Sequence, residues 1–437
     1  MPITTHRSLH ETPRWVGLLA LIVQICACSG DAERDPTADV SGSDAGDVIL
    51  APDTDWTPDV RVDAADVVEP RPWPRVTVID VRLAAGDLAQ MRADPQSREE
   101  YDAALVVDGT AYGDGEVEIH GGFARSVPKL SYRIKFSDDD IWDSGHFGAD
   151  LEEHERLVLQ ASWVDPTFIR NCLTLDLARH VGGLAPRCQY VDLALNGQAH
   201  GLYVGIERVD DRFLTRNGLS ADGLVVKAAS NNANWQDKPN PLDGYEIQIN
   251  NEAPTQSLNT LLDVCTNTPA NTDSFESEIA PMLNLDMFMA WQLAHTLADN
   301  RDTFTKNYYL HYDWVGQATP FEIITWDADA TWGRNWDGAT LDPSEITRLW
   351  GTDDFSPRLF SIESYRAQYE ADYAAWIDEE NIAEWLHENV DARAALIGEL
   401  AQRDLDRWQP GLRFQDEVDA LHEAIDARVA AMRSALE

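Results

Sequence analysis

The chain of 437 residues contains little positive charge: 34 Lys and Arg stand against 76 Asp and Glu, which gives a formal net charge of −42. This scarcity argues against a nucleic-acid-binding protein, because holding a phosphate backbone needs a basic face. An anionic membrane surface would repel the chain for the same reason, so any membrane attachment must be apolar. Apolar residues are plentiful, since 44% of the chain is hydrophobic and 15 residues are Trp. That supply suffices for one or two sizeable cores and excludes disorder throughout.

The apolar stretch over residues 16–27 is too short to span a bilayer comfortably. It follows Arg7 and Arg14 in the layout of a secretory signal. Its ending, Ile25-Cys26-Ala27-Cys28, resembles the lipobox of bacterial lipoproteins, in which the last cysteine takes a diacylglycerol and begins the mature chain. We therefore expect residues 1–28 to be a lipoprotein signal, with Cys28 as the anchor of an exported protein in the cell envelope or at its surface. An ordinary cleaved signal with incidental cysteines is the alternative.

Cysteine is scarce in the rest of the chain, where only Cys172, Cys188 and Cys265 occur. Three cysteines in an exported protein allow one disulfide and one remaining thiol. Cys172 and Cys188 are nearest in sequence and form the favoured pair. Three buried, unbridged cysteines are the alternative.

Residues 29–74 consist largely of Asp, Ala, Pro, Ser, Gly and Val. Such a segment cannot bury enough apolar surface to offset the entropy lost on ordering it, so we expect a solvated tether. Repulsion among its carboxylates favours an extended form. The folded body is therefore expected from about residue 75 to the end of the chain, and it contains no internal repeat.

Hydrophobic periodicity within this body predicts strands first, with helices later. A helix beginning at Asp165-Pro166 and ending at Gly182-Gly183 interrupts the strands, and helices dominate beyond Pro281. This order is typical of an α+β fold with two lobes, residues 75–230 and 231–437, and a mixed or antiparallel sheet in the first. The expected strands are 76–81, 104–107, 116–119, 130–136, 156–159, 190–195, 202–206, 307–312 and 321–326.

Three acidic residues and an amide are placed around the last two expected strands. Asp302 and Asn307 precede the first of these strands, while Asp327 and Asp329 follow the second. This arrangement suits phosphoryl transfer, in which one carboxylate orients or deprotonates the attacking hydroxyl and other oxygen ligands hold magnesium. A solvated acidic loop is the alternative, because acidic clusters are common in a chain this acidic.

Five segments of the body, in this order, carry a family resemblance. They are Arg125–Phe136 (Arg-Ser-Val-Pro-Lys-Leu-Ser-Tyr-Arg-Ile-Lys-Phe), Asp165–Asn171, Leu195–Asp210, Asn300–Tyr309 and Trp326–Asp329. Together they resemble the spore coat protein H (CotH) kinase-like family over the whole body, from about Val76 to the C-terminus. The resemblance implies an atypical protein-kinase fold that uses ATP with Mg²⁺ or Mn²⁺. It also implies that the acceptors are Ser or Thr hydroxyls of a protein substrate at the cell surface or envelope.

The resemblance also implies roles for individual residues. Asp302 matches the catalytic acid beside the acceptor hydroxyl. Asp327 matches the metal-binding acid, with Asn307 as second ligand and Asp329 as a less direct helper. Lys227 matches a lysine that follows an apolar strand and is a second candidate contact for the nucleotide. An ion pair with a carboxylate of the protein would explain a lysine at this position equally well.

Strand alternation places Arg133 and Lys135 on one face of their strand, where they could neutralise phosphate charge. We take Lys135 as the nucleotide lysine, with Asp176 as the nearest candidate acid to pair with it. A solvated sheet face is the alternative. Because positive charge is so scarce, we expect Arg125, Arg133, Lys135 and Lys227 to converge on one pocket.

Other polar residues in these segments leave two interpretations open. Glu207 and Asp210 follow a hairpin where the lobes should meet, which suits contacts with a nucleotide. A helix N-cap at Asp210 is the competing explanation. Arg170 and Asn171 are expected to join helix and sheet rather than to take part in catalysis.

The chain also departs from the family pattern near the expected phosphate site. The run His120–Arg125 lacks the paired serines of the family, and Leu130 stands where the family has a second lysine. These departures support an alternative, a catalytically inactive surface-binding or structural lipoprotein of the same fold. A carbohydrate-active enzyme is weaker, since the Trp residues suit core positions better. The sequence has no Gly-x-Ser-x-Gly elbow, and His120, His146, His154 and His180 form no pair at zinc spacing.

Overall fold

The computed structural model describes residues 75–137, 142, 155–253, 255–315 and 320–437. They fall within one compact unit, residues 63–437. The expected signal segment, the anchor at Cys28 and the tether lie outside the described residues. Within the described part of the chain, no helix has both the length and the apolar character needed to cross a membrane.

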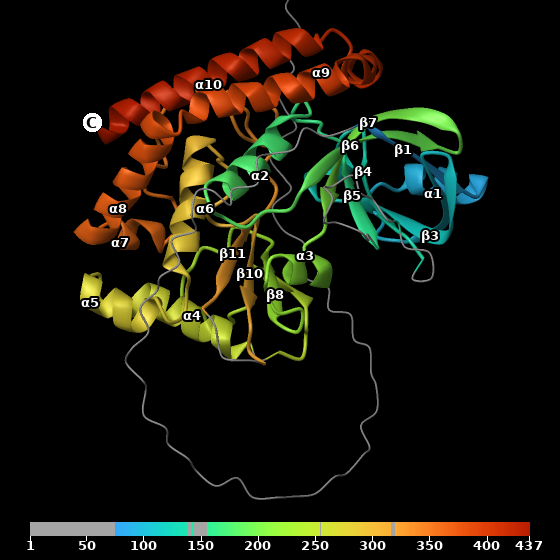
Figure 1. Cartoon of the computed structure of the whole chain (residues 1–437). Helices are drawn as coiled ribbons and strands as arrows, with labels where there is room; N and C mark the ends of the chain where they lie inside the picture. Colours follow the sequence, from blue (N-terminus) through green and yellow to red (C-terminus); the bar gives the residue numbers. More distant parts are fainter. Residues whose placement is uncertain (1–74, 138–141, 143–154, 254, 316–319) are drawn as a thin grey trace, which may run out of the picture. The chain divides into compact units, whose positions relative to one another are not determined.

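The first half of this unit is a closed barrel of seven strands in the order β1-β2-β3-β4-β5-β7-β6 (Figure 1). All neighbours are antiparallel except β1 and β6, whose parallel pairing closes the barrel. Alternate residues of β1 (Ile79, Val81 and Leu83) point into an apolar interior. The strands are β1 Thr77–Leu83, β2 Tyr101–Val107, β3 Thr110–His120, β4 Ser131–Lys135, β5 Arg156–Gln160, β6 Cys188–Leu195 and β7 Gln198–Glu207, with the short helices α1 (Ala85–Ala93) and η2 (Phe123–Ser126) between them.

A second sheet has the strand order β11-β10-β8-β9. Its central pairing is antiparallel, with Tyr309 of β10 opposite Lys227 of β8 and Tyr308 opposite Thr325 of β11. This register brings the start of β10 and the end of β11 close to Lys227. The strands are β8 Leu224–Ala228, β9 Tyr245–Ile249, β10 Tyr308–Tyr312 and β11 Glu322–Thr325.

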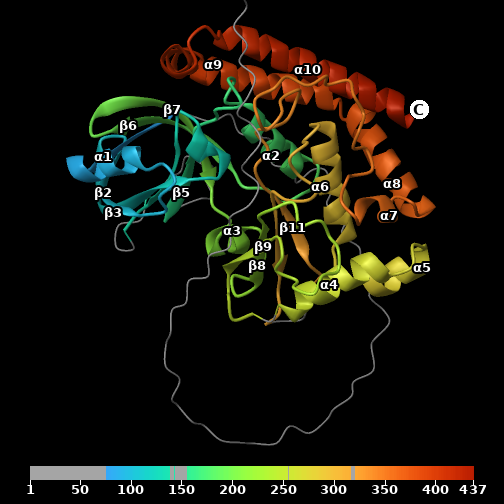
Figure 2. The ribbon, with the colours of Figure 1, turned by 180° about the vertical axis from the view of Figure 1, so that it is seen from behind.

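Helices make up most of the remaining fold, and the expected α+β class is confirmed. α6 packs against α2 and β11, and the long helices α9 and α10 lie side by side in both views (Figures 1 and 2). The helices are α2 Arg170–His180, α3 Asp211–Arg216, α4 Gln256–Asn267, α5 Thr272–Ser274, η3 Phe275–Ile279, α6 Leu285–Leu297, α7 Ser356–Leu359, α8 Glu363–Ala374, η4 Ala375–Glu379, α9 Ile382–Trp408 and α10 Phe414–Leu436.

The helix expected to begin at Asp165-Pro166 begins later, at Arg170. The buried Asp165 carboxylate accepts hydrogen bonds from the backbone N–H groups of Thr167 (3.1 Å) and Arg170 (2.8 Å). It also pairs with the guanidinium of Arg170 at 2.7 Å. Asp165 therefore holds a turn that precedes α2, and the helix starts once these bonds are made.

A disulfide joins Cys172 of α2 to Cys188 of β6, which confirms the favoured pair. Both cysteines are fully buried, and Cys265 is a buried free thiol. The bridge links α2, the helix that follows the barrel strand β5, to the start of the barrel strand β6. Such a pairing suits an oxidising compartment.

Replacement of both Cys172 and Cys188 by alanine is expected to lower the free energy of unfolding by about 2 to 4 kcal/mol, because the unfolded chain regains the freedom that the cross-link removes. Denaturant unfolding with and without reductant measures this loss. Reductant should lower the stability of the wild type but leave the double variant unchanged. The Cys265→Ala variant is the control and should keep the response to reductant. If reductant left the free energy of unfolding of the wild type unchanged, the result would contradict the disulfide.

Lys129 forms an ion pair inside the fold, where only 1% of its side chain is exposed. Its Nζ lies 2.8 Å from the Asp404 carboxylate of α9 and sits over the rings of Phe168 and Tyr203, 4.8 and 4.5 Å from their centroids. Asp404 also accepts a hydrogen bond from the backbone N–H of Leu202 at 2.8 Å. The pair therefore fixes α9 against the barrel.

Candidate functional site

A cleft of about 550 Å³ lies between the barrel strands β3 to β5 and the second sheet. Its lining gathers residues from the η2 loop, from the segment between α6 and β10 and from the segment after β11. Of the candidate site residues, those that line it are Arg125, Arg133, Lys227, Asp302, Asn307, Asp327 and Asp329. Residues far apart in the sequence thus meet here, as the strand register requires.

Asp302 lies on a turn between α6 and β10, and its neighbours fix both carboxylate oxygens. Asn307 donates from Nδ2 to Asp302 Oδ2 at 2.9 Å, and Lys306 Nζ pairs with Oδ1 at 2.8 Å. The Asn300 side chain accepts the backbone N–H of Asp302 at 3.0 Å. The turn is tied to the second sheet, because the backbone N–H of Asn307 donates to Ala228 O at 2.9 Å. Asp302 is therefore held in place before any substrate arrives.

The turn of Asp302 is supported from inside the fold. The fully buried Asn300 also donates to Nδ1 of His295, on α6, at 3.1 Å. Accepting this bond requires an unprotonated Nδ1. Burial lowers the pKa of His295 to about 3, so the ring stays neutral at ordinary pH and keeps the contact.

Asp327 and Asp329 follow β11 and share one partner, the side chain of Gln160 at the end of β5. Gln160 Nε2 donates to Asp327 Oδ1 at 3.3 Å and to Asp329 Oδ2 at 3.0 Å. Asn171 orients this amide by donating to Gln160 Oε1 at 2.6 Å, and it accepts the backbone N–H of Ala328 at 3.1 Å. The expected structural role of Asn171 is therefore confirmed, and Gln160 emerges as its partner.

Burial raises the pKa of Asp327, and the nearby Asp302 carboxylate raises it further. Burial also raises the pKa of Asp329 well above its usual value, with Asp327 as the next largest cause. Two half-buried carboxylates that repel each other are short of positive charge, and a divalent cation would supply it. Carboxylate oxygens suit Mg²⁺, which keeps few protein ligands and takes water and phosphate oxygens besides. The donor set therefore fits magnesium, although the described residues include no cluster of three or more His, Cys, Asp or Glu side chains arranged to hold a metal.

Lys227 of β8 supplies positive charge to the cleft. Its Nζ lies over the rings of Tyr309 and Trp326, 5.9 and 5.5 Å from their centroids. Burial lowers the pKa of Lys227, while the Asp327 and Glu246 carboxylates oppose that shift. Lys227 is thus a half-buried cation near the Asp327 carboxylate, in position to meet an anionic ligand.

Arg133 and Arg125 also line the cleft, but both side chains already have partners. Arg133 pairs with Glu118 and, at 3.3 Å, with Glu100. Arg125 donates to backbone carbonyls, among them Pro95 O at 3.0 Å and Gly121 O at 2.7 Å. Arg125 therefore holds the loop that carries η2, and Arg133 would have to exchange a carboxylate for a phosphate.

Lys135 is not among the described residues that line the cleft, so the expected convergence of four basic side chains fails at this position. It lies at the end of β4, where its Nζ is 4.0 Å from Glu116 of β3. Asp176, its suggested partner, instead pairs with Arg179 and Arg393. The alternation along the strand was predicted correctly, but Lys135 lies two residues beyond Arg133 and past the cleft.

Glu207 is likewise absent from the described cleft lining. It is 3% exposed, pairs with Arg216 and accepts the backbone N–H of Arg187 at 2.9 Å, so its role is structural. Asp210 is the N-cap of α3 and accepts the backbone N–H groups of Arg212 and Phe213, as the competing explanation held. Burial raises the pKa of Asp210 to about 6.

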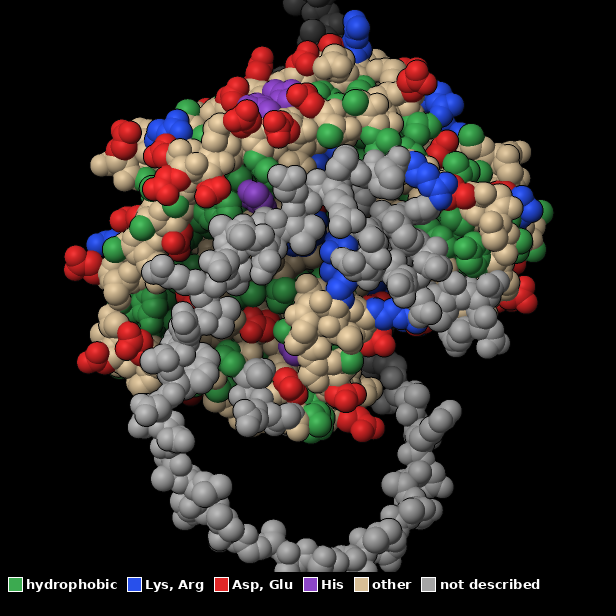
Figure 3. Space-filling view, viewed as in Figure 1, with side chains coloured by type: hydrophobic (Ala, Val, Ile, Leu, Met, Phe, Trp, Pro, Cys, Tyr) green, Lys and Arg blue, Asp and Glu red, His purple; other side chains and the backbone are tan. Residues whose placement is uncertain are grey.

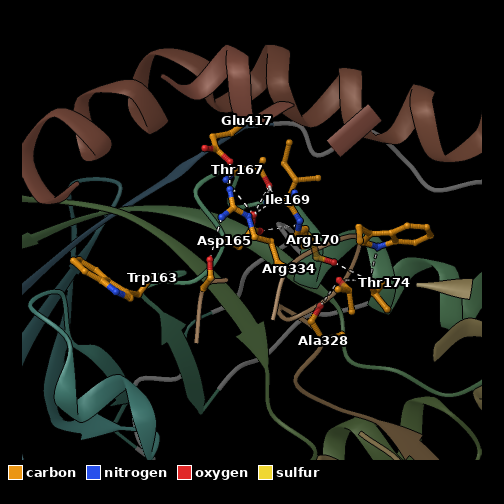
Figure 4. Close-up of polar contacts among 12 residues, drawn as sticks. Trp163, Asp165, Thr167, Ile169, Arg170, Thr174, Ala328, Arg334 and Glu417 are labelled. Carbon is orange, nitrogen blue, oxygen red and sulfur yellow. Dashed lines mark hydrogen bonds and ion pairs between the residues drawn. The ribbon is translucent and has the colours of Figure 1, made fainter. Parts of the chain in front are cut away.

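Figure 4 shows the buried pair of Asp165 and Arg170 near Ala328, the residue between Asp327 and Asp329. The Thr331 hydroxyl donates to Ala328 O at 2.9 Å and contacts Thr174 of α2 at 3.2 Å. Farther along the segment, Arg334 pairs with Glu417 of α10. These contacts anchor the chain on both sides of Asp329. Arg170 binds the Asp165 carboxylate in the turn before α2 and is not among the described residues that line the cleft.

Gln160 and Lys306 are the site residues that the sequence patterns did not identify. Gln160 is a polar residue that ends the apolar strand β5, the same signal that pointed to Asp327 after β11. Lys306 is four residues from Asp302, a spacing that suggests an ion pair only once the turn is known. Each of these two residues can be assigned to the site only once the structure shows the side chains that it contacts.

Comparisons with known proteins show the family of the chain. A family model described as CotH kinase protein matches residues 117–432. The inner spore coat protein H of Bacillus subtilis (strain 168) is 26% identical over 350 residues, which covers 78% of this chain and 92% of that protein. Among solved structures, the Helicobacter pylori proinflammatory kinase CtkA matches with 7% identity and a TM-score of 0.34, covering 77% of this chain and 94% of that one. The chain belongs to the CotH kinase protein family.

Proposed function

We propose that the chain is an atypical protein kinase that transfers phosphate from ATP, with Mg²⁺ or Mn²⁺, to Ser or Thr hydroxyls of a protein substrate. One observation carries this proposal: a cation, a fixed carboxylate and a pair of half-buried acids line the same cleft. These are the groups that phosphoryl transfer requires, because catalysis of this reaction is mainly positioning and neutralisation of charge. They are Lys227, Asp302, Asp327 and Asp329, with Asn307 beside them.

In this mechanism Asp302 orients the acceptor hydroxyl and takes its proton as the phosphate is transferred. Asn307 and Lys306 each hold one of its two oxygens in place. Asp327 and Asp329, with Asn307, would hold the metal ion, which when bound supplies positive charge to the phosphates. Lys227 would pair with a phosphate oxygen, an interaction that its burial strengthens.

The placement of these residues also supports the interpretation of the body as two lobes. The barrel would form most of an N-terminal lobe (75–230), and the later helices with β10 and β11 would form a C-terminal lobe (231–437). Nucleotide and acceptor would then meet in the cleft between the two.

Export through residues 1–28 and anchoring at Cys28 would place this activity in the cell envelope, with residues 29–74 as a tether. The disulfide of Cys172 and Cys188 supports an oxidising location. Partitioning of a Cys28→Ala protein tests the anchor. We expect it to leave the membrane fraction, and a protein that stays there is held by something other than lipid.

The proposal is tested by adding radiolabelled ATP to the soluble body from Val76 onward, with a casein-like acceptor and Mg²⁺ or Mn²⁺. We expect label on the protein or the acceptor, lost when EDTA removes the metal. We also expect nucleotide with metal to raise the melting temperature, since a ligand that binds only the folded state stabilises it. Absence of both label and thermal shift would refute the kinase proposal.

The alternative is a surface-binding or structural lipoprotein without catalysis. The observation that favours it is the engagement of Arg125 and Arg133 with protein groups, which leaves less positive charge for a nucleotide. Absence of label together with no thermal shift from nucleotide would support this alternative. The same assay therefore separates the two functions.

Gln160→Met is expected to weaken Mn²⁺ binding about 10- to 100-fold, because second-shell partners that orient metal ligands typically contribute that much. Methionine keeps the volume but removes the amide that holds Asp327 and Asp329. Titration of Mn²⁺ followed by electron paramagnetic resonance measures the change. Gln189→Met, a buried glutamine on β6 outside the cleft lining, is the matched control and should bind as the wild type does. Equal affinity in both variants would contradict the role of Gln160.

A further inference from the structure

The hairpin of α9 and α10 carries two histidines whose rings face each other. His387 of α9 and His422 of α10 approach to 2.6 Å between their Nδ1 atoms, with ring centroids 4.8 Å apart. They are 28% and 23% exposed, so the pair is reachable from solvent. Figure 3 shows histidine among Asp and Glu side chains over these two helices, at the top of the view. Neither histidine is among the described residues that line the cleft.

Each histidine contacts a carboxylate of the opposite helix through its other nitrogen. His387 Nε2 lies 2.7 Å from Asp426 of α10, and His422 Nε2 lies 3.1 Å from Asp391 of α9. A carboxylate accepts a hydrogen bond, so each Nε2 carries a proton where it makes this contact, and a ring with no second proton presents its Nδ1 lone pair. Two lone pairs only 2.6 Å apart repel each other unless a cation lies between them.

We propose that this pair is a transition-metal site that takes Zn²⁺ through the two Nδ1 atoms. Histidines that bind metals typically donate their other N–H to a carboxylate, and here both do so. Imidazole is a favoured ligand for zinc. The described residues provide no cage of three or more such side chains, so water completes the coordination.

The geometry needs only a small adjustment to accept the ion. Zinc binds imidazole nitrogen at about 2.0 to 2.1 Å, which in a tetrahedral site separates two such nitrogens by roughly 3.3 Å. The two partly exposed rings would therefore need to shift so that the distance between their Nδ1 atoms grows by less than about 1 Å. Asp391 and Asp426 are 74% and 69% exposed and add negative charge that attracts a cation to the hairpin. Because the ligands come from both helices, the ion would tie α9 to α10.

Calorimetric titration of Zn²⁺ into the metal-free full chain tests the proposal, with His387→Gln and His422→Gln beside the wild type. We expect each substitution to weaken one zinc site at least tenfold. Asp391→Asn and Asp426→Asn should each weaken it about tenfold, since they remove the carboxylate that orients the ring. Glu423→Gln, an exposed acid next to His422, is the control for general attraction of cations and should bind as the wild type does.

A second measurement separates this site from the acidic cleft. Cu²⁺ bound by two imidazoles gives nitrogen hyperfine splitting in its electron paramagnetic resonance spectrum, which carboxylate ligands cannot produce. We expect that signature in the wild type and its loss in His387→Gln, with unchanged melting temperatures in EDTA. Zinc binding that is equal in wild type and both histidine variants, or no zinc binding at millimolar concentration, would overturn the proposal and leave a proton shared by the two rings.

Discussion

Asp302→Asn is expected to lower the rate of phosphate transfer about 10²- to 10⁴-fold, the usual contribution of a positioned general base. The amide keeps the size of the carboxylate, and its single oxygen can still accept from Asn307 or from Lys306. Asn307 also donates to the backbone O of Asp302 at 2.8 Å, so the turn should persist. What it loses is the ability to take the hydroxyl proton. Initial rates with saturating ATP measure the loss in kcat, while KM for ATP should change little because Asp302 faces the acceptor.

The matched control for this substitution is Asp263→Asn on α4. Asp263 is an exposed acid whose Oδ1 also accepts from an asparagine, Asn267 at 2.7 Å. Activity should be unchanged there. If Asp302→Asn kept kcat within about threefold of the wild type, the carboxylate would not be the base. A loss of thermal stability in Asp302→Asn larger than in the control would instead indicate damage to the turn.

Much of this site could be predicted from the sequence because its residues occur where strands begin and end. Asp302 and Asn307 precede β10, and Asp327 follows β11, its antiparallel neighbour. The start of one such strand lies beside the end of the other, so the acids must be close. Lys227 joins them because β8 pairs with the other edge of β10.

The residues that were assigned incorrectly failed for tertiary reasons. Lys135 was placed on the correct face of β4, but the distance along the strand at which the cleft ends depends on the second sheet. Glu207 was expected at the nucleotide, yet Arg216 of α3 folds back to pair with it. The sequence also carried no sign of barrel closure, because the parallel contact of β1 with β6 joins residues more than 100 positions apart, such as Thr77 and Val191.

Lys129 shows that a contribution to stability, too, can depend on contacts that the local sequence does not reveal. It belongs to a run that resembles a nucleotide-binding signature, and local pattern alone gave it no role. In the structure its partner Asp404 is on α9, hundreds of residues later, and Gly201 lies so close to Asp404 that a Cβ atom there would stand 2.1 Å from the carboxylate. Packing that depends on three distant segments cannot be read from any one of them.

Lys129→Met is expected to lower the free energy of unfolding by about 3 to 5 kcal/mol, because it leaves the Asp404 charge buried without its partner. Methionine keeps most of the apolar stem between Phe168 and Tyr203, so lost volume accounts for little of this. Burial lowers the pKa of Lys129 to about 8 and raises that of Asp404, which means that each charge depends on the other to remain in the interior. Denaturant unfolding at pH 7 measures the effect.

A double-mutant cycle with Asp404→Asn distinguishes the charge from the packing. Asparagine can still accept a hydrogen bond from the backbone N–H of Leu202. It has no charge that would be left buried without a partner. Lys129→Met combined with Asp404→Asn should therefore be more stable than Lys129→Met alone, since replacing both partners of a buried pair costs less than removing one. Lys135→Met is the control, because Lys135 is partly exposed and 4.0 Å from Glu116, and its loss should cost no more than about 0.5 kcal/mol. Equal losses at Lys129 and Lys135, or a double variant less stable than Lys129→Met, would show that the buried pair does not hold α9 to the barrel.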